Sequence, residues 1–128
     1  MQPIEFKYPE QPEQQISEHI LQNNTPAACT SIELDLRKLK DVWGKDVYGY
    51  SGVGGRDRKE ERIEILKNEI ASGSTYMPII FLTDMAPEGL SFEDGRHRTA
   101  VLIEAGYETA MFVVPSHQAE QIKKFFGP

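Results

Sequence analysis

The chain has 128 residues, 39% of them hydrophobic, and a formal net charge of −6. This length predicts a single domain with a modest core. The acidic balance argues against a general nucleic-acid-binding protein, because such binding draws on a net basic surface. Cys29 is the only cysteine, which excludes an intrachain disulfide and favours a reducing, cytoplasmic setting. The longest apolar run, from Met77 to Leu82, is too short to span a membrane.

The first 30 residues are expected to form an N-terminal arm and a short helix, and residues 31–128 the main domain. Residues 1 to about 11 have the composition of an extended or mobile arm. Pro12 suits the first position of a helix, whose pattern stops at Asn23-Asn24. From Ser31 to Arg37 apolar and charged residues alternate, which predicts a half-buried strand.

The segment from Asp41 to Gly55 is rich in glycine and carries Trp43, Tyr48 and Tyr50. It is expected to be either a functional, mobile loop or an ordinary surface excursion. It is not a P-loop, because no Gly-Lys-Ser/Thr closes it. A helix is expected next, from Asp57 to Ser72, and Gly73 ends it. Its inward-facing residues are predicted to be Ile63, Leu66 and Ile70.

The second half of the chain predicts three strands and two helices. Ser116 is expected to cap the last helix. The predicted fold class is therefore α/β or α+β, in the form of a compact domain with a small mixed sheet flanked by helices. The strands are expected at Pro78–Leu82, Leu90–Glu93 and Thr109–Val114, and the inward residues of the last helix are Ile122, Phe125 and Phe126.

The turn that follows the second of these strands breaks a local rule. Asp94-Gly95 leads directly into a helix pattern, so Arg96, His97 and Arg98 fall in its first turn. The free N–H groups and the dipole of a helix N-terminus favour anions, and a cation there is opposed by roughly 0.3–1 kcal/mol. A bound phosphate group would turn this conflict into a binding site.

A second, weaker signal lies near the start of the preceding helix. Arg58 and Arg62 share one flank, and like charges at this spacing repel by roughly 0.2–0.5 kcal/mol. They are candidates for the same anion, and the simpler alternative is a solvated charged face. His19 and His117 have no spacing relation to other ligands, so no metal site is predicted from histidine or cysteine.

The order of elements, with its Asp-Gly-Arg-His-Arg junction, resembles the ParB/sulfiredoxin superfamily over roughly Ser31 to Val114. The resemblance implies a ParB/sulfiredoxin-like fold and a turn that holds nucleotide phosphates, on Gly95, Arg96, His97, Arg98 and Thr99, with help from Arg62. The turn is most similar to that of a free-serine kinase in this superfamily. The matching segments are Ile32–Leu36, Arg58–Ala71 with Gly73, Met77-Pro78-Ile79-Ile80, and FEDGRHRTAVLIEAGYETAMFVV.

Departures from the family pattern narrow the chemistry. Sulfiredoxin has a cysteine where this chain has Arg96, which argues against sulfinic-acid reduction. ParB proteins have a Gly-Glu-Arg-Arg turn and a helix-turn-helix module, neither of which is found here, which argues against a partition protein. The kinase's catalytic acid lies between the first strand and the first helix. The candidates for that acid here are Asp41, Asp46 and Asp57.

The expected ligand is a nucleotide (ATP, ADP or CTP) with Mg²⁺, and the expected reaction is phosphoryl transfer or hydrolysis. His97 contacts phosphate, acts as an acid or base, or belongs to a surface ion pair. Asp94 either forms the turn, orients an arginine or holds Mg²⁺ through the phosphates.

One alternative function is that of a non-enzymatic nucleotide sensor or inhibitor of plasmid or phage type, whose protein partner binds the loop from Trp43 to Tyr50. A nuclease is the least favoured reading. The sequence does not indicate which base the nucleotide carries, which group accepts the phosphoryl group, the oligomeric state or the biological pathway.

Overall fold

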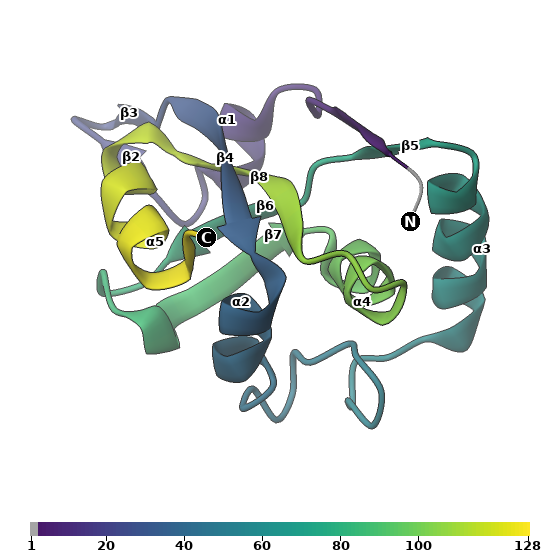
Figure 1. The fold of residues 1–128 in the computed structure, drawn as a ribbon. Coiled ribbons are helices and arrows are strands. Elements are labelled where there is room, and N and C mark those ends of the chain that lie inside the picture. The colour runs from purple at the N-terminus through teal and green to yellow at the C-terminus, as the bar shows by residue number, and fades with distance from the viewer. Residues whose placement is uncertain (1–2) are drawn as a thin grey trace.

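The computed structural model of the chain describes residues 3–128, in which a four-stranded mixed sheet carries helices on both faces (Figure 1). Residues 1 and 2, the start of the predicted arm, lie outside the described residues. The sheet has the order β4-β8-β6-β7. The pairs β4–β8 and β6–β7 are antiparallel, whereas β6 runs parallel to β8. The strands are β4 (Cys29–Asp35), β6 (Ile79–Leu82), β7 (Leu90–Asp94) and β8 (Thr109–Pro115).

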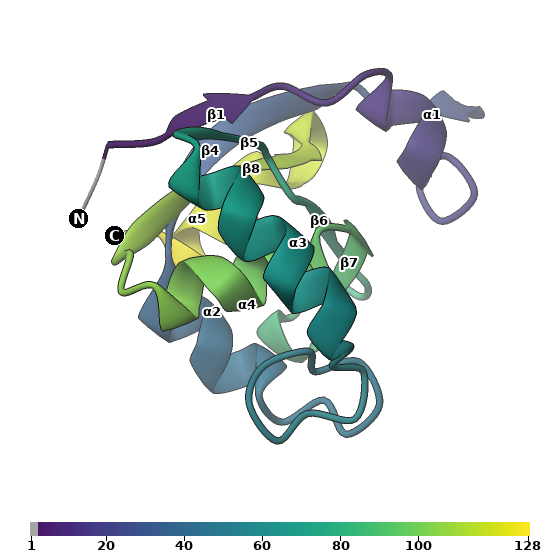
Figure 2. The same ribbon diagram turned by 90° about the vertical axis from the view of Figure 1, so that its right-hand side faces the viewer.

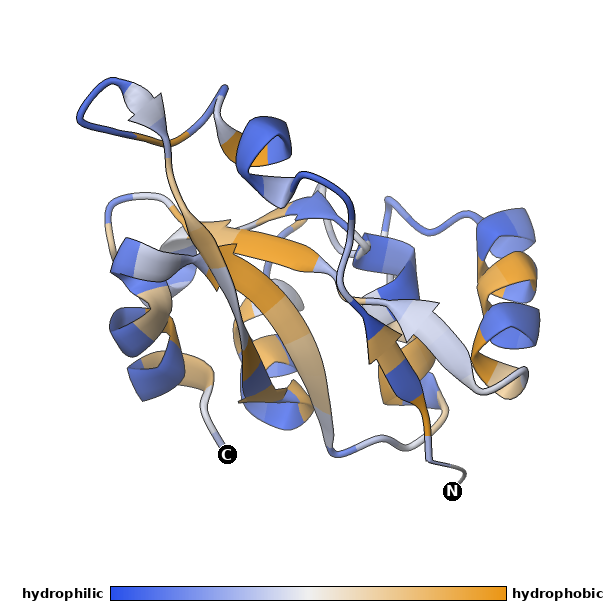
Figure 3. Cartoon of the chain, turned by 90° about the horizontal axis from the view of Figure 1, so that it is seen from above, coloured by the Kyte–Doolittle hydropathy of each residue, from blue (hydrophilic) through white to orange (hydrophobic). Residues whose placement is uncertain are grey.

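Strand β6 lies inside the sheet, and all of its side chains are buried. Successive side chains of a strand point to opposite faces. Ile80 and Leu82 accordingly join the large core cluster, whereas Ile79 and Phe81 join a smaller one. This explains why the sequence of β6 is a continuous apolar run rather than an alternating one. The apolar strands form the middle layer of the molecule in Figure 3.

Five α-helices cover the sheet. Four of them contribute to the large core cluster, and α1 reaches the smaller cluster through Ile16. The stripe predicted for α3 is confirmed, because Ile63, Leu66 and Ile70 are all buried. Gly73 follows α3 with φ 99°, a conformation that suits the end of a helix. The helices are α1 (Pro12–Ile16), α2 (Leu36–Trp43), α3 (Glu60–Ala71), α4 (Arg96–Glu104) and α5 (Ala119–Phe126).

Helix α2 occupies a segment that was expected to be the end of a strand and the start of a loop. The strand ends at Asp35, whose carboxylate accepts hydrogen bonds from the backbone nitrogens of Arg37 and Lys38. This carboxylate caps the helix. The missed signal was the helical spacing of Leu36, Leu39 and Trp43, which are all buried.

The N-terminal segment is paired with the rest of the chain. Strand β1 (Glu5–Lys7) runs parallel to β5 (Ser74–Tyr76) as a separate two-stranded sheet. Helix α1 ends at Ile16, earlier than predicted. The strands β2 (Leu21–Gln22) and β3 (Thr25–Pro26) form a hairpin instead. Asn23 and Asn24 have φ 54° and 62°, as the two central residues of a type I′ turn require.

The last helix also begins later than expected. Ser116 opens a single 3₁₀ turn to Gln118, and α5 follows without a side-chain cap. Ile122 and Phe126 are buried as predicted, and Phe125 is partly buried. Across residues 3–128 there is no helix with the length and apolar character needed to cross a lipid bilayer.

Candidate functional site

The turn between β7 and α4 requires a glycine for two reasons. Gly95 has φ 92°, in the left-handed region. A Cβ atom at this position would lie 2.6 Å from the Cβ of Pro78, which directly precedes β6. Close approach to Pro78 and a left-handed backbone therefore both exclude a side chain at Gly95.

Arg96, His97 and Arg98 lie in the first turn of α4, as the sequence predicted. The helix begins without a side-chain cap, and its first turn contains no acidic residue. The first N–H groups of a helix have no intrahelical acceptor, so they are open to water or an anion. Helix α2 offers the opposite case, because Asp35 already occupies its N-terminus. Of these two helix starts, α4 is the one suited to an anionic ligand.

The start of α4 opens into a hollow of about 390 Å³, here called the turn hollow. Helices α3 and α4 lie side by side around it, as Figure 2 shows. Its walls come from β7, the first turn of α4, the first half of α3 and the residues just before α3. The lining residues are Asp57, Lys59, Glu61, Arg62, Leu66, Glu93, Asp94, Gly95, Arg96, His97 and Arg98.

The turn hollow has balanced charge. Four of its lining residues carry positive charge and four are carboxylates, with His97 between them. Phosphate oxygens bind cations and helix N–H groups, whereas carboxylates repel a bare phosphate. Carboxylates do suit Mg²⁺, which proteins hold through one or two acidic side chains together with substrate phosphates. The hollow therefore fits a phosphate chain that carries a metal ion better than a free anion.

His97 joins α4 to the residues just before α3. Its Nε2 atom lies 3.0 Å from the backbone nitrogen of Lys59 and 3.0 Å from the backbone oxygen of Asp57. Burial lowers the pKa of His97 below its ordinary value of 6.5, and the nearby positive charges of Arg62 and Lys59 lower it further against the opposing effect of Asp57. Its Nδ1 atom has no hydrogen-bond partner among residues 3–128, and His97 is one of the residues that line the hollow.

Asp57 is the loop carboxylate that the structure brings to the turn hollow. Its Oδ2 atom accepts a hydrogen bond of 2.6 Å from Ser51, whose side chain is fully buried. Asp46, another of the three candidate acids, is instead used in a local turn with the nitrogens of Tyr48 and Gly49. Asp41 lies on α2 and does not line the hollow. The sequence could not separate these three, because all of them stand between the predicted first strand and the predicted helix, or at the start of that helix.

Arg98 is 9% exposed and lies between two hollows. Its Nε atom donates to Thr75 Oγ1 at 2.8 Å and to Glu69 Oε2 at 3.3 Å. Thr75 in turn donates to Glu69. Within the described part of the chain the terminal nitrogens Nη1 and Nη2 make no hydrogen bond. The Nε atom thus fixes Arg98 in place, and the Nη1 and Nη2 atoms are left to donate hydrogen bonds to a ligand.

Two of the predicted phosphate ligands lie outside the turn hollow. Arg58 donates to both carboxylate oxygens of Glu104, at 2.8 and 2.9 Å, and to Glu60 at 2.6 Å. These bonds raise the pKa of Arg58 further. Thr99 is fully buried, and its hydroxyl donates to the backbone oxygen of Gly95 at 2.8 Å. Thr99 therefore supports the turn, whereas Arg58 joins the segment before α3 to the last residue of α4.

The remaining predicted residues line the hollow with exposed side chains. Arg62 stands on α3, and Arg96 reaches back to the backbone oxygen of Phe92 at 3.5 Å. Asp94 lines the turn hollow and the neighbouring hollow alike. Glu93 forms an ion pair with His19 at 3.1 Å. Lys59 and Glu61 are lining residues that the sequence did not single out.

The second hollow beside Arg98, here called the arm hollow, has a volume of about 670 Å³. It lies under the segment that connects β1 to α1, and shares Asp94 and Arg98 with the turn hollow. Its chemistry is polar, with three glutamine amides and one aromatic ring. The lining residues are Pro9, Glu10, Gln11, Gln14, Gln15, Tyr76, Asp94 and Arg98.

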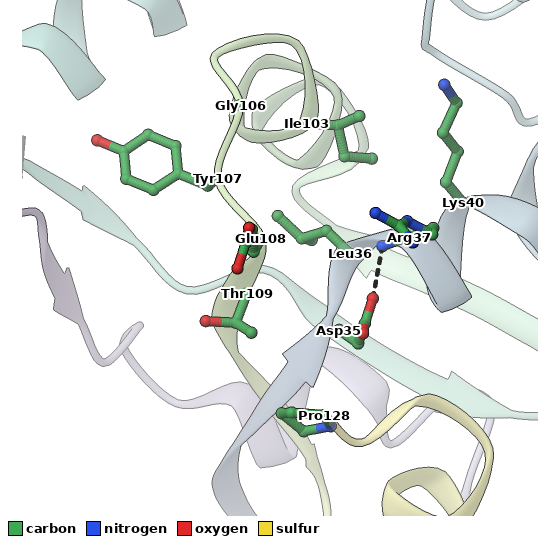
Figure 4. A pocket seen from close by; sticks show the side chains of 10 residues that line it. All are labelled: Asp35, Leu36, Arg37, Lys40, Ile103, Gly106, Tyr107, Glu108, Thr109 and Pro128. Atoms are coloured by element: carbon green, nitrogen blue, oxygen red, sulfur yellow. Dashed lines mark hydrogen bonds between the residues drawn. The ribbon is translucent and has the colours of Figure 1, made fainter. Parts of the chain in front are cut away.

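A further hollow of about 620 Å³ lies at the opposite end of α4 (Figure 4). Among its lining residues, Arg37 and Lys40 belong to α2, and Tyr107 belongs to the link between α4 and β8. None of the predicted site residues lines it. The C-terminal end of α4 carries the negative end of the helix dipole, and Asp35 occupies the start of α2. This hollow is consequently less suited to an anion than the turn hollow.

Trp43 was expected in an exposed loop, and this expectation is wrong. Its side chain is 2% exposed and packs against Tyr50 and Phe92, with ring centroids 4.9 and 4.8 Å away. The reason is that Trp43 belongs to α2, whose inner face it extends. The middle of the loop is also anchored, because Ser51 is fully buried.

No group of three or more metal-binding side chains converges at one point within residues 3–128. A metal ion at the turn would therefore be held by the ligand as well as by the protein. Comparisons with protein-family models, with curated proteins and with solved structures find no match to this chain.

Proposed function

We propose that the protein binds the phosphates of a nucleotide in the turn hollow and transfers or hydrolyses the terminal phosphoryl group. The observation that carries the proposal is the uncapped N-terminus of α4, which opens into a hollow lined by four cationic side chains and His97. The amides of the first turn would hold phosphate oxygens, and Arg62, Arg96 and Arg98 would neutralise them. The order of elements around this turn also supports a fold of ParB/sulfiredoxin type.

Phosphoryl transfer depends mainly on positioning and on stabilisation of charge, so a rigid cradle supplies much of the catalysis. Asp57 and Asp94 are the carboxylates that would hold Mg²⁺ beside the phosphates or accept a proton from the attacking hydroxyl. The Nδ1 side of His97 would contact the phosphate chain. Because burial keeps His97 largely neutral at neutral pH, its role there is a hydrogen bond rather than a full charge.

A calorimetric titration with ATP, ADP, CTP and GTP, each with and without Mg²⁺, tests this proposal. We expect at least one nucleotide to bind below millimolar concentration, and to bind more tightly with Mg²⁺ because the carboxylates oppose a bare phosphate. Arg62→Ala is expected to weaken binding about tenfold, whereas Arg58→Ala leaves it unchanged because Arg58 is committed to Glu104. Absence of binding by every nucleotide would refute the proposal.

A second candidate is a nucleotide sensor that acts through a protein partner. It is favoured by the exposure of Val47, Tyr48 and Val53, which are 63%, 78% and 73% exposed. Large apolar side chains gathered in one exposed segment are typical of contact surfaces. Nucleotide binding without release or transfer of phosphate would favour this candidate over the enzyme.

A further inference from the structure

The arm hollow is joined to the turn hollow through two shared side chains, Asp94 and Arg98. Arg98 is nine-tenths buried, and its Nε atom is fixed by Thr75 and Glu69. Its terminal nitrogens find no acceptor elsewhere in the described chain. A ligand that contacts Arg98 in one hollow therefore lies beside the other.

The charges of the two hollows differ. The turn hollow carries four cationic side chains and four carboxylates, whereas the arm hollow has a single cation, Arg98, against the carboxylates of Glu10 and Asp94. Phosphates are thus opposed less by charge in the turn hollow than in the arm hollow. An uncharged, polar part of the same ligand would fit the arm hollow.

The side chains of the arm hollow suit such a group. The amides of Gln11, Gln14 and Gln15 each offer donors and an acceptor, which is what the edge of a base or a ribose hydroxyl requires. Gln15 is held in place by a 3.0 Å hydrogen bond from its Nε2 atom to the backbone oxygen of Glu10, which leaves its carbonyl oxygen to accept.

The ring of Tyr76 supplies an aromatic surface. It is 42% exposed and lies on β5, with the Lys7 ammonium 4.3 Å from its centroid. Tyr76 is one of the residues that line the arm hollow, whereas Lys7 is not. An exposed tyrosine ring can stack on a nucleobase of any type.

We propose that the arm hollow binds the base and ribose of the nucleotide whose phosphates lie in the turn hollow, with Tyr76 and Gln14 as contacts. This inference rests on the proposed function, since it assigns the second half of the same ligand. It makes the N-terminal segment from Pro9 to Gln15 part of the binding site.

The test compares nucleotides with inorganic tripolyphosphate, which offers the phosphate chain alone, in calorimetric titrations with Mg²⁺ on the full chain. ATP, CTP or GTP is expected to bind at least tenfold more tightly than tripolyphosphate. Tyr76→Ala is expected to weaken nucleotide binding about tenfold and to leave tripolyphosphate binding unchanged. Arg62→Ala, in contrast, weakens both ligands equally.

Two controls separate the contact from an effect on folding. Tyr76→Phe keeps the aromatic ring and the β1–β5 pairing, and it is expected to bind nucleotide nearly as well as the original chain. Tyr48→Ala removes another exposed tyrosine, which lines neither hollow, and is expected to change nothing. Gln14→Ala, on the exposed side of α1, should weaken nucleotide binding without affecting tripolyphosphate.

The outcomes distinguish the two proposals. If tripolyphosphate binds as tightly as every nucleotide, or if the Tyr76→Ala and Gln14→Ala variants bind nucleotide normally, the assignment of the arm hollow is wrong while the phosphate site stands. If neither tripolyphosphate nor any nucleotide binds, the phosphate site itself is wrong, and the assignment of the arm hollow falls with it.

Discussion

The Nε2 atom of His97 lies 3.0 Å from the backbone nitrogen of Lys59, so that the first turn of α4 holds the residues from which α3 begins. A neutral imidazole can accept this hydrogen bond, whereas an imidazolium has no free lone pair on Nε2. A protonated Nε2 instead donates to the backbone oxygen of Asp57, also at 3.0 Å, so the protonation of His97 decides which of the two contacts is a hydrogen bond.

The stability of the protein should depend on this histidine between neutral and mildly acidic pH. Burial depresses the pKa of His97 in the folded state below 6.5, so the unfolded chain binds the proton more readily. The stability that the protein gains by keeping His97 neutral is fully present above pH 6.5, and it is lost as the pH falls through the lower pKa of the folded state. Urea unfolding at several pH values should show a steeper loss for the original chain than for His97→Gln. Parallel curves would contradict the prediction.

A side chain at Gly95 should be costly for two separable reasons. Gly95→Ala combines a left-handed backbone with a clash against Pro78 and should lower the free energy of unfolding by about 2 kcal/mol or more. Gly106 is a matched control, since it has φ 90° with no atom within 4 Å of the added Cβ. Gly106→Ala should cost only about 1 kcal/mol. If urea unfolding shows the same loss of free energy for both variants, contact with Pro78 has no effect.

Arg58 and Arg62 stand four residues apart and should separate stability from binding. Arg58→Ala is expected to lower the free energy of unfolding by about 1 kcal/mol, because it removes a two-pronged ion pair with Glu104. Arg62→Ala should leave stability within about 0.5 kcal/mol. A double-mutant cycle with Glu104→Ala, read by urea unfolding, measures the pair directly. Additive losses would mean that the Arg58–Glu104 pair contributes nothing.

Arg96 and Arg98 form a second pair of matched positions in one helical turn. Arg98→Ala should lower the free energy of unfolding by about 2 kcal/mol, because Glu69 and Thr75 lose a buried partner. Arg96→Ala, at an exposed position, should change it by less than about 0.5 kcal/mol. Thermal and urea unfolding of both variants check this difference. A similar loss for both would place the stabilising effect elsewhere in the turn.

Local spacing was enough to predict much of the secondary structure. The buried stripe of α3, the apolar strand β6 and the start of α4 after Gly95 all follow from residue order, because helices and strands repeat with fixed periods. The same approach failed for α2, where a capping aspartate and an aromatic residue at helical spacing were read as a strand end and a loop. Glycines that follow Trp43 hid the helix pattern.

The sequence by itself determined that three basic residues stand at the start of a helix, and that a turn of Asp94-Gly95 places them there. Only the tertiary structure decided which basic residues can meet a ligand. Arg58 turns to Glu104, Arg98 is anchored by Glu69 and Thr75, and Asp57 reaches the hollow. These partners lie far apart in the chain, so their meeting depends on how α3 packs on α4 rather than on local spacing. For the same reason the arm hollow, which joins the N-terminal segment to Arg98, has no signature in the sequence.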